Sequence, residues 1–293
     1  MADMEVVLRA DTIIGESPTW SAEEGVLYFI DVKAPALFRL HPESLQVDRW
    51  SFASDIGGFA LLTGHGGALA ALRTGLHRLD FATRSTELVA PAPFDPAMLR
   101  FNEGGCDPAG RFWVGVMFDP IDPSSSSRPG ALHSYTTAEG LRSEPDLAEL
   151  HNGMAWSADG TRMFLSHSDR RQIHHFAYAG GQMSDKTLFA TIPEADGIPD
   201  GAAIDTAGGY WCALHGGGCL RRFNSDGTVD RTIPLPVSQP TMCCFAGPEL
   251  ADLYVTTATD KLTAEQRRQE PLAGALLRLR PGERGVPRRC TLA

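Results

Sequence analysis

The stretch that decides the fold is HNGMAWSADGTRMFLS, residues 151–166. It opens with Asn-Gly, passes through a short apolar piece, turns at Asp159-Gly160 and continues as a longer apolar piece. Asn-Gly and Asp-Gly pairs are typical of tight turns between strands. The stretch therefore predicts a short strand, a hairpin turn and a second strand that is more deeply buried.

This pattern occurs six times along the chain. Its copies are PTWSAEEGVLYFI (18–30), FALLTGHGGALAAL (59–72), GGCDPAGRFWVGV (104–116), GMAWSADGTRMFLS (153–166), GAAIDTAGGYWCAL (201–214) and MCCFAGPELADLYVTT (242–257). Most copies are followed by another strand that ends in a polar turn, which makes a unit of roughly four strands and about 49 residues, within the period of propeller blades. A two-sheet sandwich, the alternative, would not explain six returns of one hairpin.

We therefore predict an all-β fold, a six-bladed β-propeller of four-stranded blades that forms a single domain over residues 1–293. One blade cannot bury both of its faces, whereas six blades in a ring can. The ring has to close, and we expect the N-terminal strand MEVVLRAD (4–11) to join the blade made by the C-terminal residues. Helical periodicity is clearest over Ala264–Glu270, and SSSSR (124–128) is expected to be a loop.

The composition narrows the classes of function. The chain is 43% hydrophobic with a net charge of −10, so bulk charge does not favour binding to nucleic acid or to an anionic membrane. No apolar run approaches the 18 residues of a membrane span, and the first residues lack the apolar core of a signal peptide. None of the six cysteines forms a CxxC pair. We expect a cytoplasmic protein with reduced thiols, a small-molecule ligand, and a monomeric or small homo-oligomeric state.

A shared register points to a metal site. When the six units are aligned on the apolar residue before the hairpin turn, the residues four positions earlier are Glu16, Gly58, Asn102, Asn152, Asp200 and Thr241. In a propeller the first strand of each blade lies nearest the axis, so these positions converge at one channel mouth. Each polar residue taken singly is typical of a turn or a surface. Together, the four carboxylate or carboxamide side chains, without Cys or His, favour a hard cation such as Ca²⁺, with Mg²⁺ and Mn²⁺ compatible.

The motifs also resemble a known family. GESPTW (15–20), RFNEGGCDPAGRFWVGVM (100–117), HNGMAWSADG (151–160), IPDGAAIDTAGGYWCALHGGG (198–218) and AGALLRLRPG (273–282) are similar to the SMP-30/gluconolactonase/regucalcin family, in order and almost end to end. The resemblance implies a six-bladed propeller with one divalent metal near the axis. It also implies hydrolysis of sugar lactones to aldonic acids, as in several members.

The resemblance assigns roles to particular residues. The metal ligands would be Glu16, Asn152 and Asp200, and Asp200 would also be the catalytic base. The metal would be one divalent ion, with Ca²⁺ the first expectation and Zn²⁺, Mn²⁺, Mg²⁺ or Fe²⁺ compatible. The substrate contacts would be Arg100 and Asn102, with Glu103 and Asp119 expected in the pocket at positions where the chain departs from the family pattern.

These assignments describe a lactonase. The metal would polarise the lactone carbonyl, Arg100 would hold sugar hydroxyls, and Asp200 would take a proton from water, with Glu103 as a second candidate base. No GxSxG, HExxH or GxxxxGK[ST] motif indicates another chemistry. The alternatives are a calcium-binding regulatory protein without turnover and a hydrolase of other esters or phosphotriesters. His151 is left open between pocket and surface, and His167 between core and site.

Overall fold

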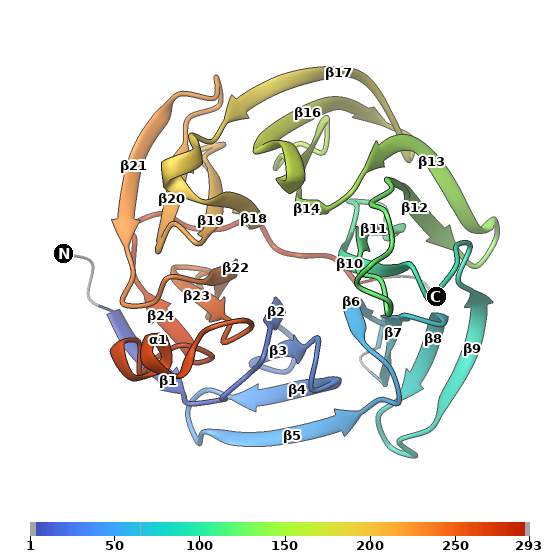
Figure 1. Cartoon of the computed structure of the whole chain (residues 1–293), viewed down its shortest axis with the longest axis horizontal. Coiled ribbons are helices and arrows are strands. Elements are labelled where there is room, and N and C mark those ends of the chain that lie inside the picture. The colour runs from blue at the N-terminus through green and yellow to red at the C-terminus, as the bar shows by residue number, and fades with distance from the viewer. Residues whose placement is uncertain (1–3, 65, 291–293) are drawn as a thin grey trace.

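The computed structural model describes residues 4–64 and 66–290, which form six four-stranded antiparallel sheets around a central axis (Figure 1). The predicted six-bladed β-propeller is therefore confirmed. Residues 1–3 and 291–293 of the predicted domain, and His65 of the second repeat, lie outside the described residues.

The first three blades follow the repeats in order. Blade 1 contains β2 (Gly15–Ser21), β3 (Val26–Asp31), β4 (Ala36–His41) and β5 (Gln46–Ser51). Blade 2 contains β6 (Ile56–Leu61), β7 (Gly67–Leu72), β8 (Gly75–Asp80) and β9 (Thr86–Pro91). Blade 3 contains β10 (Leu99–Cys106), β11 (Phe112–Phe118), β12 (Gly130–Thr136) and β13 (Gly140–Ala148).

The last three blades complete the ring. Blade 4 contains β14 (His151–Trp156), β15 (Arg162–His167), β16 (Gln172–Ala179) and β17 (Gln182–Thr191). Blade 5 contains β18 (Ile198–Ile204), β19 (Tyr210–His215), β20 (Cys219–Phe223) and β21 (Val229–Pro234). Blade 6 contains β22 (Pro240–Ala246), β23 (Asp252–Thr257), β24 (Leu276–Leu279) and the N-terminal β1 (Met4–Leu8).

The pairing of β1 with β24 closes the ring as predicted, because it joins the two ends of the chain in one sheet. The short helices are η1 (Ser168–Arg170), η2 (Glu194–Asp196) and α1 (Ala264–Gln269), the last at the predicted helical segment. Thr263 caps α1: its side chain accepts from the Gln266 N–H, while the Gln266 side chain accepts from the Thr263 N–H. Among the described residues, no helix combines the length and apolarity needed to cross a bilayer.

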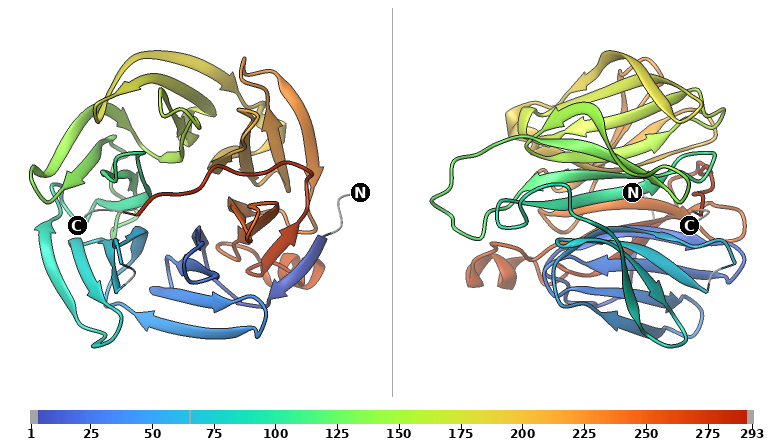
Figure 2. Two further views of the ribbon diagram at one scale, coloured as in Figure 1. Left: turned by 180° about the vertical axis from the view of Figure 1, so that it is seen from behind. Right: turned by 90° about the vertical axis from the view of Figure 1, so that its right-hand side faces the viewer.

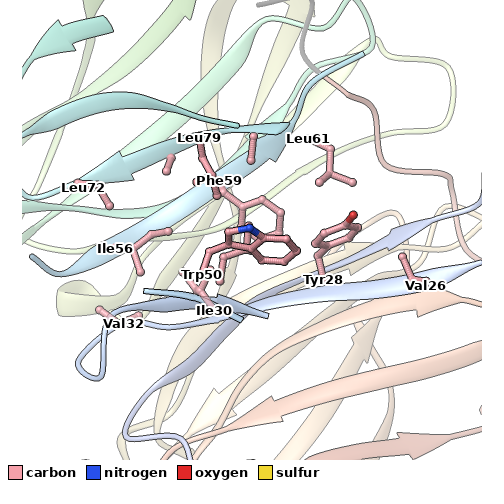
Figure 3. Packing of buried hydrophobic residues seen from close by; sticks show 13 residues of the cluster. Val26, Tyr28, Ile30, Val32, Trp50, Ile56, Phe59, Leu61, Leu72 and Leu79 are labelled. Atoms are coloured by element: carbon pink, nitrogen blue, oxygen red, sulfur yellow. The ribbon is translucent and has the colours of Figure 1, made fainter. Parts of the chain in front are cut away.

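Burial falls from the axis outward. All six residues of β6 are buried, whereas five of the six residues of β9, the outer strand of the same blade, are exposed. Between blades 1 and 2, aromatic side chains of facing sheets fill the gap, with Tyr28 and Phe59 ring centroids 6.4 Å apart and Trp50 beside them (Figure 3). Each fully buried side chain of this size stabilises the fold by about 1.5–3 kcal/mol. This packing holds the inner strands as a rigid frame for the channel.

The two ends of the channel are built differently. The β11–β12 loop (119–129) and α1 project at the end where the inner strands begin (Figure 2). The C-terminal segment after β24 crosses the other end of the ring, where the Val286 N–H donates to the Ile204 carbonyl (3.0 Å) and the Gly285 N–H to the Leu250 carbonyl (2.8 Å) (Figure 1). The predicted site residues lie at the first end.

Candidate functional site

Every inner strand is irregular at the predicted register. The strand pairings shift between Glu16 and Thr19, Ile56 and Gly58, Asn102 and Gly104, Asn152 and Ala155, Pro199 and Ala202, and Pro240 and Met242. A bulge re-aims a side chain away from the regular alternation of a strand. The six shifts therefore occur at or beside the six aligned positions, at the starting ends of the strands around the axis.

Three carboxylates from three blades are buried at this mouth. Glu16 is 7% exposed, Glu103 2% and Asp200 9%. Burial, and then repulsion from Glu103, raises the pKa of Glu16 to about 8, and burial raises the pKa of Glu103 to about 7. Burial, and then repulsion from Glu16 and Glu103, raises the pKa of Asp200 well above its usual range. These effects mean that the three groups share one low-dielectric space in which the charges of Arg100 and Arg288 only partly offset burial and repulsion.

Few donors reach these carboxylates. The Ser17 N–H donates to Glu16 Oε2 (2.8 Å), with Ser17 held at a φ of 51°. Glu103 accepts from the Gly153 N–H (2.7 Å) and the Met154 N–H (2.6 Å) through its two oxygens. Glu103 thus joins blade 3 to the inner strand of blade 4, and its oxygens are already used. In the described part of the chain, no side chain donates a hydrogen bond to the Asp200 carboxylate.

A chain of hydrogen bonds leads from blade 4 to the edge of the mouth. Asn102 Nδ2 donates to Asn152 Oδ1 (2.6 Å), and Arg100 Nη1 donates to Asn102 Oδ1 (2.7 Å). Arg100 Nε then donates to Asp119 Oδ2 (3.1 Å). Ser168 fixes the other side of the Asn152 amide by accepting from its Nδ2 (3.0 Å). The structure therefore connects Asn152, Asn102, Arg100 and Asp119 in one network.

The donor set suits a hard cation. Glu16, Asn152 and Asp200 offer oxygen ligands, and the charge of the buried carboxylates among them is only partly compensated. A divalent ion would remove the repulsion that raises their pKa values. The positive charge of Arg288, on the C-terminal segment, partly compensates the buried carboxylates, because it lowers the pKa values of Glu16 and Glu103. The residues present therefore fit the metal that the resemblance implies.

Asp146, His151 and His167 form a second group whose ligand atoms all lie within 4.8 Å of one another, close enough to hold a metal ion. All three are buried. His167 Nε2 lies 2.6 Å and His151 Nε2 3.2 Å from Asp146 Oδ1. Lys186 Nζ lies 2.6 Å from Asp146 Oδ2, so a protein ammonium already neutralises this carboxylate.

Hydrogen bonding at the other ring nitrogen fixes the tautomer of His151. The Val116 N–H donates to His151 Nδ1 (3.3 Å), which leaves the proton on Nε2 facing Asp146. A metal ion at Nε2 would displace that proton and the Lys186 ammonium. His151 is thus neither surface nor channel lining, and His167 belongs to the same buried group between blades 3 and 4.

The comparisons with known proteins identify the family of this chain. Residues 14–259 match the model of a family described as SMP-30/Gluconolactonase/LRE-like region. The chain belongs to this family. Family relatives include a 6-deoxy-6-sulfogluconolactonase of Pseudomonas putida, 35% identical over 94% of each chain. Human regucalcin is 31% identical over 94% of this chain and 93% of its own.

Solved structures show the same fold. Regucalcin from Agrobacterium tumefaciens, titled a calcium-binding protein, has a TM-score of 0.90 at 23% identity and covers 99% of this chain and 97% of its own. A gluconolactonase from Xanthomonas campestris has a TM-score of 0.75 at 21% identity, over 95% and 89% of the two chains. These likenesses establish the shared propeller.

Sequence reasoning missed the charged groups around the predicted residues. Asp119 Oδ2 accepts from Lys33 Nζ (2.6 Å), Arg73 Nη2 (2.5 Å) and Arg100 Nε (3.1 Å), and the first two also contact Asp55. These charged residues come from three blades, so no local sequence motif contains them together. A search of the blade-start loops for charge would have found Lys33 and Arg73, because each follows the strand that pairs with the first strand of its blade.

Proposed function

We propose that this protein hydrolyses a sugar lactone to its aldonic acid at the channel mouth, with one divalent ion held by Glu16, Asn152 and Asp200. The observation that carries the proposal is the set of three buried, mutually repelling carboxylates in a chain of the gluconolactonase family. The names of the sulfogluconolactonase and gluconolactonase relatives support a lactone as the substrate class. We expect a cytoplasmic protein, monomeric or a small homo-oligomer.

Calcium is the first expectation for the ion, because the ligands are oxygens alone and the regucalcin neighbour is titled calcium-binding. Zn²⁺, Mn²⁺, Mg²⁺ and Fe²⁺ fit the same donors. When bound, the ion supplies Lewis-acid polarisation of the lactone carbonyl and compensates negative charge.

The protein's own residues would orient the lactone and accept the proton from water. Asp200, which accepts from no side chain among the described residues, would take a proton from the attacking water once the charge of the ion offsets the burial and repulsion that raise its pKa. Arg100 and Asn102 would orient the sugar, since Arg100 is 3% exposed and hydrogen-bonded in a fixed position. Glu103 would hold the inner strand of blade 4 beside the substrate. Asp119 would meet the sugar at the edge of the mouth.

The test measures acid release from glucono-, galactono-, xylono- and arabinolactones, with and without EDTA and with each divalent ion restored. Asp200→Asn should lower kcat/KM by roughly 100-fold or more, the size expected when a general base is lost. Asp260→Asn, on the loop after β23 at the same end, is the matched control and should keep full activity. Activity that survives both EDTA and Asp200→Asn would overturn the mechanism.

A calcium-binding protein without turnover is the second candidate, favoured by the regucalcin relatives and by the same carboxylates. It predicts tight Ca²⁺ binding by calorimetry with no acid release from any lactone. Release of product from simple esters or phosphotriesters, but not from lactones, would instead indicate the other hydrolase class.

A further inference from the structure

We propose that Lys33, supported by Arg73 and Arg100, recognises an anionic substituent, a sulfonate or a phosphate, at the far end of the lactone. This inference rests on the proposed lactonase function and names its substrate class. The structural basis is the group formed by Lys33, Asp55, Arg73, Arg100 and Asp119, called here the ionic cluster. It places more positive than negative charge at the edge of the candidate site.

The ionic cluster lies at the mouth because of strand pairing. Gly15 pairs with Asp31, so Lys33 follows β3 at the end where β2 begins with Glu16 beside the axis. Leu72 pairs with Ile56, which puts Arg73 at the same end of blade 2. Leu99 pairs with Phe118, so Asp119 emerges there from blade 3.

Three cations share two carboxylates, which leaves one positive charge in excess. Lys33 Nζ lies 2.9 Å from Asp55 Oδ2 and 2.6 Å from Asp119 Oδ2. Arg73 Nη2 lies 2.8 Å and 2.5 Å from the same two oxygens. The carboxylates hold the cations together, and the cations in turn lower the pKa values of Asp55 and Asp119, so these stay ionised at neutral pH. The excess charge is therefore permanent.

Of the three cations, Lys33 has a hydrogen-bond donor that stays unused among the described residues. Arg73 donates from Nε, Nη1 and Nη2 to Asp55, Asp119 and the Pro96 carbonyl, which uses all its hydrogens. An ammonium has three donors, and within residues 4–64 and 66–290 Lys33 uses two of them. Its side chain is also the most exposed of the three cations, at 28% against 13% for Arg73 and 3% for Arg100.

The ionic cluster is connected to the reacting end of the site. Asp119, Arg100, Asn102 and Asn152 are joined by three consecutive hydrogen bonds of 3.1, 2.7 and 2.6 Å. A lactone with its carbonyl at the buried carboxylates would extend along Arg100 and end at Lys33. An anion there meets a partly desolvated ammonium, where charge-assisted hydrogen bonds are stronger than in water. A neutral hydroxymethyl group at the same place would not pair with the excess positive charge.

The test compares glucono-1,5-lactone with its 6-deoxy-6-sulfo and 6-phospho derivatives. Wild-type protein should prefer the anionic lactones, and Lys33→Met should lower their kcat/KM by about tenfold or more while changing the neutral lactone about twofold at most. Lys33→Arg should restore most of the preference. Lys261→Met removes an 85% exposed lysine at the same end and should change nothing. The sulfonate and phosphate arms show which anion is bound better.

Binding separates this inference from the proposed function. Calorimetry with 6-deoxy-6-sulfogluconate and gluconate should give tighter binding for the former, and Lys33→Met should abolish the difference. Equal handling of charged and neutral ligands, or equal losses for both in Lys33→Met with an unchanged melting temperature, would overturn the inference. If no lactone is hydrolysed but the difference in binding persists, the proposed function fails and the anionic subsite stands.

Discussion

Gly153 shows why the candidate site tolerates few residue types. Its φ of 61° lies in the left-handed region, and it turns the chain so that the Gly153 and Met154 N–H groups both face Glu103. A Cβ at this position would overlap Ser166 Oγ and Tyr210 Oη. The Asn-Gly pair is therefore more than a turn, because Asn152 joins the network and the Gly153 N–H beside it binds Glu103.

Gly153→Ala should destabilise the protein by about 2 kcal/mol or more, from backbone strain and overpacking. Chemical denaturation at pH 7 measures the change. Gly180→Ala is the matched control, because Gly180 also has a positive φ of 58° but an added Cβ there meets no atom of the described residues within 4 Å. A loss no larger than that of the control would show that packing against Ser166 and Tyr210 does not matter.

Asp200→Asn should raise the stability of the metal-free protein, although it lowers activity. The substitution removes a buried carboxylate that repels Glu16 and Glu103. We expect a higher melting temperature in EDTA and a smaller increase on adding Ca²⁺ than in wild type. An unchanged melting temperature in EDTA would mean that the carboxylate is compensated by other means.

At the scale of elements, the inner strands combine two demands. Their apolar residues pack between blades, while the bulge near each start frees one side chain from the sheet. Deeper in the blades, β12 and β16 carry histidines held neutral. Burial, and then repulsion from His151, lowers the pKa of His133 to about 4. Burial, and then the charges of Lys186 and His167, lowers the pKa of His174 to about 4.

These histidines should make stability depend on pH. Between about pH 6.5 and 4 these histidines bind protons in the unfolded chain but not in the folded chain, so their contribution to the free energy of unfolding falls as pH falls through this window. His133→Phe, which keeps a ring against Phe94 and Phe101, should reduce the slope by about 1 kcal/mol per pH unit. Urea denaturation at several pH values measures it. Identical slopes in variant and wild type would contradict the prediction.

At the scale of the whole molecule, closure of the ring brings together residues that no single blade can. Glu16, Glu103 and Asp200 come from blades 1, 3 and 5, and the ring that brings these blades around one axis is closed where β1 completes blade 6. The opposite end of the ring is crossed by the C-terminal segment, whose Arg288 Nη2 donates to the Ala202 carbonyl (3.4 Å). The charge balance of the site is thus a property of the assembled propeller.

The metal-free protein should lose stability as pH rises. Glu16 and Glu103, with pKa values of about 8 and 7, keep protons that the unfolded chain releases near pH 4.5. Their contribution is full below about pH 4.5 and declines up to about pH 8. Ca²⁺ at 100 times its Kd should add about 2.7 kcal/mol. Melting temperatures in EDTA and in Ca²⁺ from pH 6 to 8.5 should diverge, and parallel curves would contradict the cation site.

The repeated hairpin, with its period of about 49 residues, was enough to predict the blades. The need of a ring to close predicted the pairing of MEVVLRAD, and helical periodicity predicted the helix over Ala264–Glu270. The aligned register predicted which positions lie at the mouth, and the roles of Glu16, Asn152 and Asp200 in metal binding stay predictions. The prediction of the blades succeeds because the periodicity of turns and buried strands is local and repeats in every blade.

Only the tertiary structure decided the partners of each side chain. In the folded chain, Glu103 accepts hydrogen bonds from the Gly153 and Met154 backbone, and His151 lies beside Asp146. Lys33 and Arg73 form ion pairs with Asp119. Apart from His151 and Asp146, which are five positions apart, these contacts join residues tens of positions apart. Their strength depends on burial and on the sum of nearby charges. Burial and the sum of nearby charges depend on the closed ring. The sequence alone therefore determined the blades and the aligned positions, whereas the tertiary structure decided the electrostatics of the site.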